Sequence, residues 1–168
     1  MRLVSSAIFA LTLLTVGAAQ AAVSSVDVTL GPRLQAKAKA LGQLDLDELA
    51  ASLRSTVEGQ LKRDGRLAKD APDGDRISLV IEDAKPNRPT RGQLDATPGL
   101  SLRSLSIGGA EVSGVIITAS GQRTPVHETW YEDSFRNERG QATTTWSDAE
   151  YVFDKVARDL SRQQDASR

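Results

Sequence analysis

His127 is the residue whose type most readily performs catalysis, because it is the only histidine in a chain of 168 residues that contains no cysteine. One imidazole cannot supply the two or three histidines of a typical catalytic zinc site. As a general base, His127 would need a nucleophile and an orienting carboxylate near it in space, and no motif points to either. A hydrolase that uses His127 with Glu128 or Ser134 stays open as one hypothesis, but the sequence predicts no catalytic residue, no metal site and no cofactor.

Two further patterns imitate ligand sites. The pair Gly108-Gly109, followed by Gly114, lacks the Lys-Ser or Lys-Thr of a Walker phosphate loop and lies among strand-like residues. It indicates a bulge, a sharp turn or the close approach of another segment. The aspartates at 70, 73 and 75 surround Gly74 but miss the spacing of an EF-hand loop, so they indicate a solvated turn.

The segment 83–93 combines two stiffening prolines with Lys85, Arg88 and Arg91. Its cations could meet an anionic ligand, a lipid head group or the acidic patch of a partner. The alternative is an ordinary ordered loop that covers a sheet edge. Together with polar and aromatic residues nearby and on a later strand, the candidate binding residues are Lys85, Asn87, Arg88, Arg91, His127, Trp130 and Tyr131.

Residues 1–21 have the pattern of a secretory signal peptide: Arg2, an apolar run over 8–16, and small side chains at both cleavage positions of Ala19-Gln20-Ala21. The apolar run is shorter than the roughly 20 residues that span a bilayer. We expect cleavage near Ala21 and a periplasmic or secreted protein. The absence of cysteine excludes disulfides and the lipid-bearing cysteine of a lipoprotein. A formal net charge of −1 argues against nucleic-acid binding.

Hydrophobic periodicity predicts the elements that must position these residues. Alternation predicts strands near 26–30, 77–82, 100–107, 110–119 and 126–133. Asp45 with Glu48 marks the start of an amphipathic helix over 46–64, and Ser147 caps a second helix over 148–163. Proline and glycine leave 86–99 as a long irregular connection. We predict a single α+β domain over 22–164, with an antiparallel sheet of about five strands, two main helices on one face, and a disordered tail over 165–168.

The C-terminal half resembles a known class of domain. Pro98-Gly99-Leu100, the stretch through Gly108-Gly109-Ala110, a turn with Gly121 and a closing helix after Trp146-Ser147 carry the likeness. This pattern resembles uncharacterised exported domains of Gram-negative envelope proteins, several of them lipoproteins. The resemblance implies a small α+β domain related in outline to envelope assembly factors, and it implies no catalytic residue. The chain departs from the lipoprotein members because it has no cysteine.

Two hypotheses therefore stand beside the hydrolase. In the first, the protein is a non-catalytic exported domain that binds another envelope protein through the 85–99 loop or an exposed strand edge. In the second, it binds a small molecule or lipid between sheet and helices, with Trp130 or Tyr131 at the mouth of the site.

Overall fold

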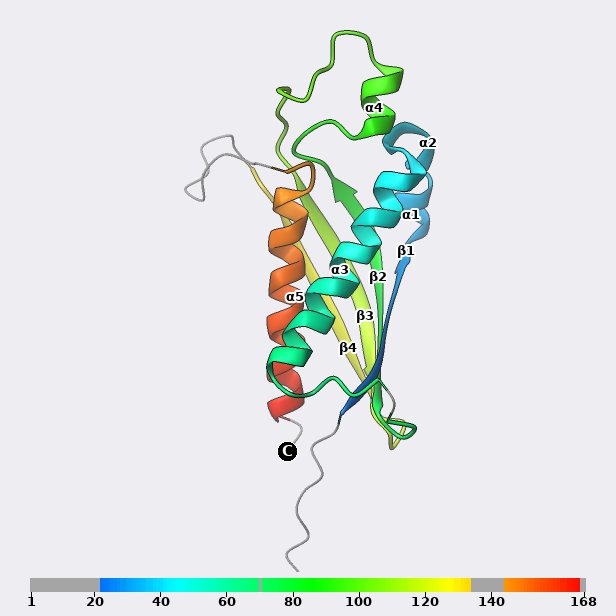
Figure 1. Cartoon of the computed structure of the whole chain (residues 1–168), viewed down its shortest axis with the longest axis vertical. Coiled ribbons are helices and arrows are strands. Elements are labelled where there is room, and N and C mark those ends of the chain that lie inside the picture. The colour runs from blue at the N-terminus through cyan, green and yellow to red at the C-terminus, as the bar shows by residue number, and fades with distance from the viewer. Residues whose placement is uncertain (1–21, 70, 134–143, 167–168) are drawn as a thin grey trace, which may run out of the picture.

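The structure is a computed structural model, and it describes residues 22–69, 71–133 and 144–166 (Figure 1). The predicted signal peptide and Ser134 lie outside the described residues. The elements follow one another as β1 (Val23–Leu30), α1 (Pro32–Gln35), α2 (Ala38–Leu41), α3 (Gln43–Arg63), β2 (Asp75–Lys85), α4 (Arg91–Ala96), β3 (Gly109–Ile117), β4 (Arg123–Tyr131) and α5 (Ser147–Ala166).

The four strands form one mixed sheet in the order β1-β2-β3-β4. β1 pairs with β2 in parallel, with Val26 beside Ile77 and Leu30 beside Ile81, and the other two pairings are antiparallel. The α+β class is confirmed, but the prediction of an antiparallel sheet of about five strands is wrong. The long helix α3 carries the chain back to the end of the sheet where β1 began, and a crossover of that kind makes the next strand parallel.

The predicted strand over 100–107 does not form. Its apolar residues change phase between Leu102 and Leu105, so they would not share one face of a strand. The chain instead curls into turns in which Leu100 N donates to Thr97 O (3.2 Å) and Ser104 N donates to Ser101 O (2.9 Å). Alternation predicts a strand only where a neighbouring ladder can pair with it. This segment has none, so Leu102 is left in solvent.

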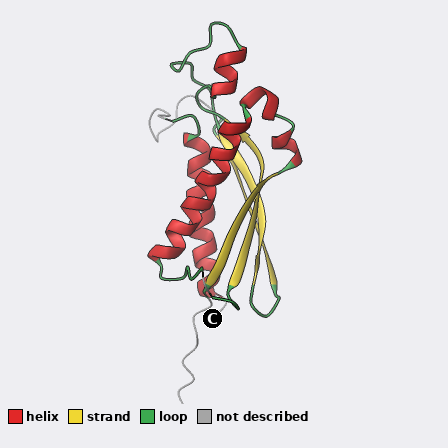
Figure 2. Cartoon of the chain, turned by 45° about the vertical axis from the view of Figure 1, so that its right-hand side comes forward, coloured by secondary structure: helices red, strands yellow, loops and turns green. Residues whose placement is uncertain are grey.

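The two long helices lie side by side on one face of the sheet (Figures 1 and 2). In α3 the predicted apolar stripe is confirmed, because Leu46, Leu49, Leu53, Val57 and Leu61 are all buried. In α5, Val152, Phe153, Val156 and Leu160 are buried in the same core. The 3.6-residue period of both stripes directs these side chains into one continuous layer against the sheet.

Candidate functional site

Residues 85–107 form one end of the molecule, which we call the tip, and they extend beyond the sheet and α5 (Figures 1 and 2). β2 ends at Lys85, and Pro86 has no N–H with which to continue the ladder. Thr90 then starts α4: its hydroxyl oxygen accepts a hydrogen bond from Gln93 N (3.2 Å), and Gln93 Oε1 accepts one from Thr90 N (3.1 Å). This capping box produces a short helix inside the connection predicted to be irregular.

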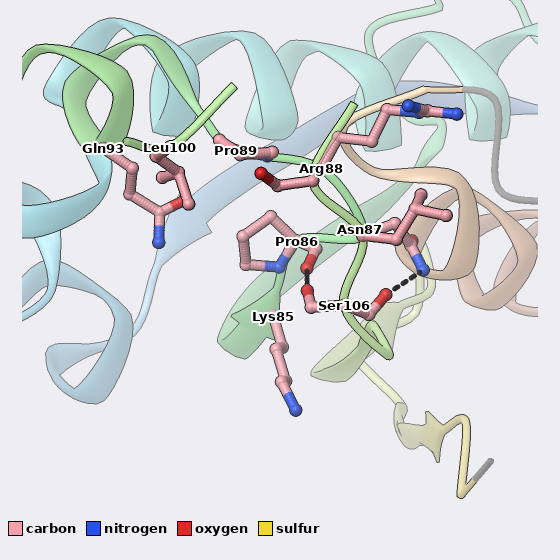
Figure 3. Close-up of a pocket in the computed structure, with 10 residues that line it drawn as sticks. Lys85, Pro86, Asn87, Arg88, Pro89, Gln93, Leu100 and Ser106 are labelled. Atoms are coloured by element: carbon pink, nitrogen blue, oxygen red, sulfur yellow. Dashed lines mark hydrogen bonds between the residues drawn. The ribbon is translucent and has the colours of Figure 1, made fainter. Parts of the chain in front are cut away.

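A pocket of about 270 Å³ opens in the tip (Figure 3). It lies between the segment that leaves β2 and the loop that leads into β3. Its lining mixes proline and leucine side chains with two cations, and contains Lys85, Pro86, Asn87, Arg88, Pro89, Gln93, Leu100, Ser104, Leu105 and Ser106. Three of the seven candidate residues therefore meet at one concave site: Lys85, Asn87 and Arg88.

Asn87 fastens the tip to the start of α5. Its side chain is buried, Nδ2 donates to Asp148 Oδ2 (2.5 Å) and to Ser106 O (3.3 Å), and Oδ1 accepts from Asp148 N (2.8 Å). Both ends of the amide are thus satisfied inside the protein, as buried polar groups require. Asn87 shapes the pocket wall through these bonds.

The glycine pair permits two close approaches. A Cβ on Gly108 would lie 2.6 Å from Asn87 Oδ1, and one on Gly109 would lie 2.4 Å from Trp130 O. Gly109 also has a φ of 151°, which side chains rarely adopt. The interpretation of this pair as a site of close backbone approach is confirmed, and Gly108 N donates to Asp148 Oδ2 (3.0 Å), which joins it to the Asn87 contacts.

The two arginines of the segment are held in different ways. Arg88 donates from Nη1 to Leu102 O (2.8 Å) and so supports the loop that carries the pocket's leucines. Arg91 pairs with Asp45 (3.4 Å) and with Glu48, both in α3. The hydrogen bond to Glu48 raises the pKa of Arg91, ahead of the bond to Asp45. Arg91 therefore joins α4 to α3, and it does not line the pocket.

His127 lies on β4, exposed on the sheet face that the two long helices leave open, opposite Ser113 of β3. Glu128 points to the other face, where it accepts a hydrogen bond from Lys155 of α5. Successive side chains of a strand alternate between faces, so the sheet separates the imidazole from this carboxylate. Ser134, the other residue of the hydrolase hypothesis, lies outside the described residues.

Trp130 and Tyr131 end β4 and also point to opposite faces. The ring of Trp130 meets the ring of Tyr151 on α5 edge to face, with centroids 5.1 Å apart. Tyr131 is 38% exposed on the open face. Burial, followed by the charges of Asp83 and Glu111, raises the pKa of Tyr131 to about 12. These two side chains do not line the pocket in the tip.

Sequence reasoning missed the two leucines of the pocket and gave Gln93 no role. Leu100 and Leu105 fell in the predicted strand, and Gln93 fell in a connection with no assigned structure. One signal was available: Thr90 followed three residues later by Gln93 is the spacing of a capping box.

The described ranges contain neither a cluster of metal ligands nor a membrane-spanning helix. There, no three histidine or carboxylate side chains gather where they could hold a metal ion. Over the same residues, no helix combines the length and the hydropathy needed to cross a membrane.

Comparisons with known proteins give structural neighbours only. No family model and no curated protein matches the chain. One similar solved structure is a minor lipoprotein from Acinetobacter baumannii, 14% identical, with a TM-score of 0.37, which covers 86% of this chain and 94% of that one. Another is the rare lipoprotein B from Shewanella oneidensis, 9% identical, with a TM-score of 0.41, which covers 85% and 95%. Both are bacterial lipoproteins, and likeness at this level assigns no role to any residue.

Proposed function

We propose that this protein is an exported, non-catalytic component of the bacterial cell envelope that binds a partner protein with its tip. One observation carries the proposal. Among the residues that the structure describes, the exposed large apolar side chains are all at the tip end: Leu44, at the start of α3, Leu102, Leu105 and Tyr131, at the end of β4. The pocket opens at this same end, and Leu105 belongs to its lining.

The two tip leucines lie in a segment that forms no strand, and both are exposed. Leu102 is 66% and Leu105 39% exposed, and neither belongs to the buried core. Clustered apolar surface beside a concavity is typical of an interaction site, whereas scattered exposed leucines would need no explanation. A partner that covers both leucines would remove this surface from water, which is the main driving force of association.

The strand edges offer less to a partner. Hydrogen bonds from Thr118 N to Gln122 O and from Glu132 N to Gly108 O fix the alternation along β3 and β4. In this pattern hydrogen-bonded and non-hydrogen-bonded pairs alternate, and Pro125 belongs to a non-hydrogen-bonded pair with Val115. The backbone nitrogen of Pro125 therefore faces the free edge of β4, where proline has no N–H to donate to an added strand. At the other edge, residues 66–68 bond the start of β1, and Gln35 Nε2 donates to Leu30 O (3.2 Å) at its end.

The space between sheet and helices offers little to a ligand. It is occupied by fully buried side chains from both layers, among them Leu53, Leu79, Ile81, Val112 and Phe153. We therefore place binding at the tip rather than in this interface.

A photo-crosslinking residue placed at position 102 tests the proposal in the cells that produce the chain. A discrete crosslinked species is expected at 102, and Leu105→Glu in the same chain should abolish it, because a buried carboxylate opposes docking. The matched control is position 122, which is exposed in the hairpin between β3 and β4 at the opposite end. An equal species at 122, or none at 102, would overturn the proposal. Fractionation of the same cells tests export, and recovery of the chain from the cytoplasm would contradict it.

A further inference from the structure

We infer that the tip pocket accepts one aliphatic side chain of an extended partner segment and holds a carboxylate next to it. This inference rests on the proposed function and names the chemistry of the partner. Size, charge and a donor in the pocket lining each support it.

The size of the pocket suits a side chain. Pockets that bind drug-sized ligands measure roughly 300–1,000 Å³, and this one measures about 270 Å³. Its apolar walls are the rings of Pro86 and Pro89 and the side chains of Leu100 and Leu105. A leucine or isoleucine side chain fits within such a volume and leaves room for a neighbouring polar group, whereas a lipid with several acyl chains exceeds it.

The charge of the lining selects an anion. Lys85 and Arg88 belong to the lining, and no carboxylate does. Lys85 is exposed and pairs with no carboxylate in the described parts of the chain. Arg91 shows the contrast, because Asp45 and Glu48 already neutralise it outside the pocket. An acidic group next to the bound side chain would therefore find a cation that the fold leaves unpaired.

Gln93 supplies a directional donor. Its Oε1 is used by the capping box, where it accepts from Thr90 N (3.1 Å). Its Nε2 makes no hydrogen bond within the described residues, and it belongs to a side chain that lines the pocket. Figure 3 shows the Gln93 amide nitrogen turned away from Pro89, and the Arg88 guanidinium extending away from both Gln93 and Leu100. A carboxylate of the partner can therefore accept a hydrogen bond from Gln93 Nε2 at the part of the pocket that the Arg88 guanidinium does not occupy.

NMR titration of the ¹⁵N-labelled chain, purified after export, tests the inference with small probes. N-acetyl-leucine carries the aliphatic group and the carboxylate, and N-acetyl-leucinamide carries only the first. We expect saturable shifts of the Leu100, Leu105 and Ser106 amides with the acid, and roughly tenfold weaker binding of the amide, because a charge-assisted hydrogen bond is lost.

Three variants locate the anion site. Lys85→Gln should weaken binding of the acid several-fold. Gln93→Glu should do the same while it preserves α4, because glutamate also completes a capping box. Lys62→Gln removes an equal charge near the end of α3, far from the pocket, and should change nothing.

Several results would overturn the inference. Equal binding of acid and amide would exclude the carboxylate, and absence of shifts with either probe would exclude the side-chain pocket. Octanoate that binds at least tenfold more tightly than N-acetyl-leucine would identify an acyl-chain site instead. Each of these results, combined with a specific crosslink at position 102, would leave the proposed function standing.

Discussion

Both ends of this molecule contain buried polar side chains that fix loops by hydrogen bonds, but the two ends differ in how much apolar surface they leave exposed. At the end opposite the tip, Arg66 is buried and donates to Ser161 O (2.7 Å), while buried Asp75 accepts from Ala119 N (3.0 Å). Val23 N donates to Arg66 O (2.7 Å), which closes the start of β1. Every described large apolar side chain at this end is covered. This end therefore presents no exposed large apolar side chain to a partner, within the described residues.

At the tip, a comparable set of buried polar groups leads to an open surface. Asn87 and Asp148 are as buried as Arg66 and Asp75 and are just as fully bonded. What they hold in place, however, is a loop with exposed leucines and a pocket. Since fixing a loop costs conformational entropy, an anchored loop that leaves apolar side chains in water points to a use outside the fold itself.

The largest contrast should appear in stability. Leu53→Ala, in the buried stripe of α3, should lower the free energy of unfolding by about 2–5 kcal/mol, because it leaves a cavity in the core. Leu102→Ala should change it by less than about 0.5 kcal/mol, because that side chain is already in water. Urea denaturation measures both. If the two variants lost similar stability, the tip leucine would be part of the core and the contrast between the ends would fail.

The second largest effect should come from the contacts of Asn87, which fix the tip to α5. Asn87→Ala should cost about 1–3 kcal/mol, because it leaves buried partners unsatisfied. Gly108→Ala should also destabilise, since its new methyl would meet the Asn87 amide at 2.6 Å. In the double variant the clash disappears. The two changes should therefore couple by about 0.5–3 kcal/mol, and simple additivity would show that Asn87 is not what Gly108 accommodates.

Most of the secondary structure could be predicted because its determinants are local. The stripe of α3 follows from residue spacing alone. The position of α5 was also predicted, but Ser147 is its first residue rather than its cap, since Trp146 O accepts the bond from Glu150 N (2.8 Å). The parallel pairing of β1 and β2 could not be predicted in this way, since a buried strand shows the same pattern beside a parallel or an antiparallel neighbour. The prediction for 100–107 failed for a different reason: its apolar positions change phase between Leu102 and Leu105, and no ladder is available to it.

The candidate site was only half predictable. The cations Lys85 and Arg88 stand out in the sequence because they accompany prolines. Their meeting with Leu100 and Leu105 depends on a chain reversal that includes Gly99, whose φ of 84° is unfavourable for other residues. His127 attracted attention through its chemistry, yet the alternation of β4 places it on a different face from Glu128.

The smallest expected effect is a pH-dependent change in stability at the end opposite the tip. The hydrogen bond from Ser161 Oγ to Asp64 (2.5 Å), helped by Gln60, lowers the pKa of Asp64 below its ordinary 3.8. A carboxyl whose pKa is lower in the folded state stabilises the fold above its unfolded pKa, and this contribution is lost as the pH falls through the folded pKa. Ser161→Ala should therefore raise the pKa of Asp64 toward 3.8 and reduce stability slightly near neutral pH, with the difference from the parent protein lost in acid as the pH falls through the folded pKa. NMR titration of the Asp64 carboxyl and denaturation near neutral pH and in acid measure the two effects. A stability difference that persists once the Asp64 carboxyl is protonated would mean that Ser161 acts through packing, and that this end of the molecule is held by something other than this hydrogen bond.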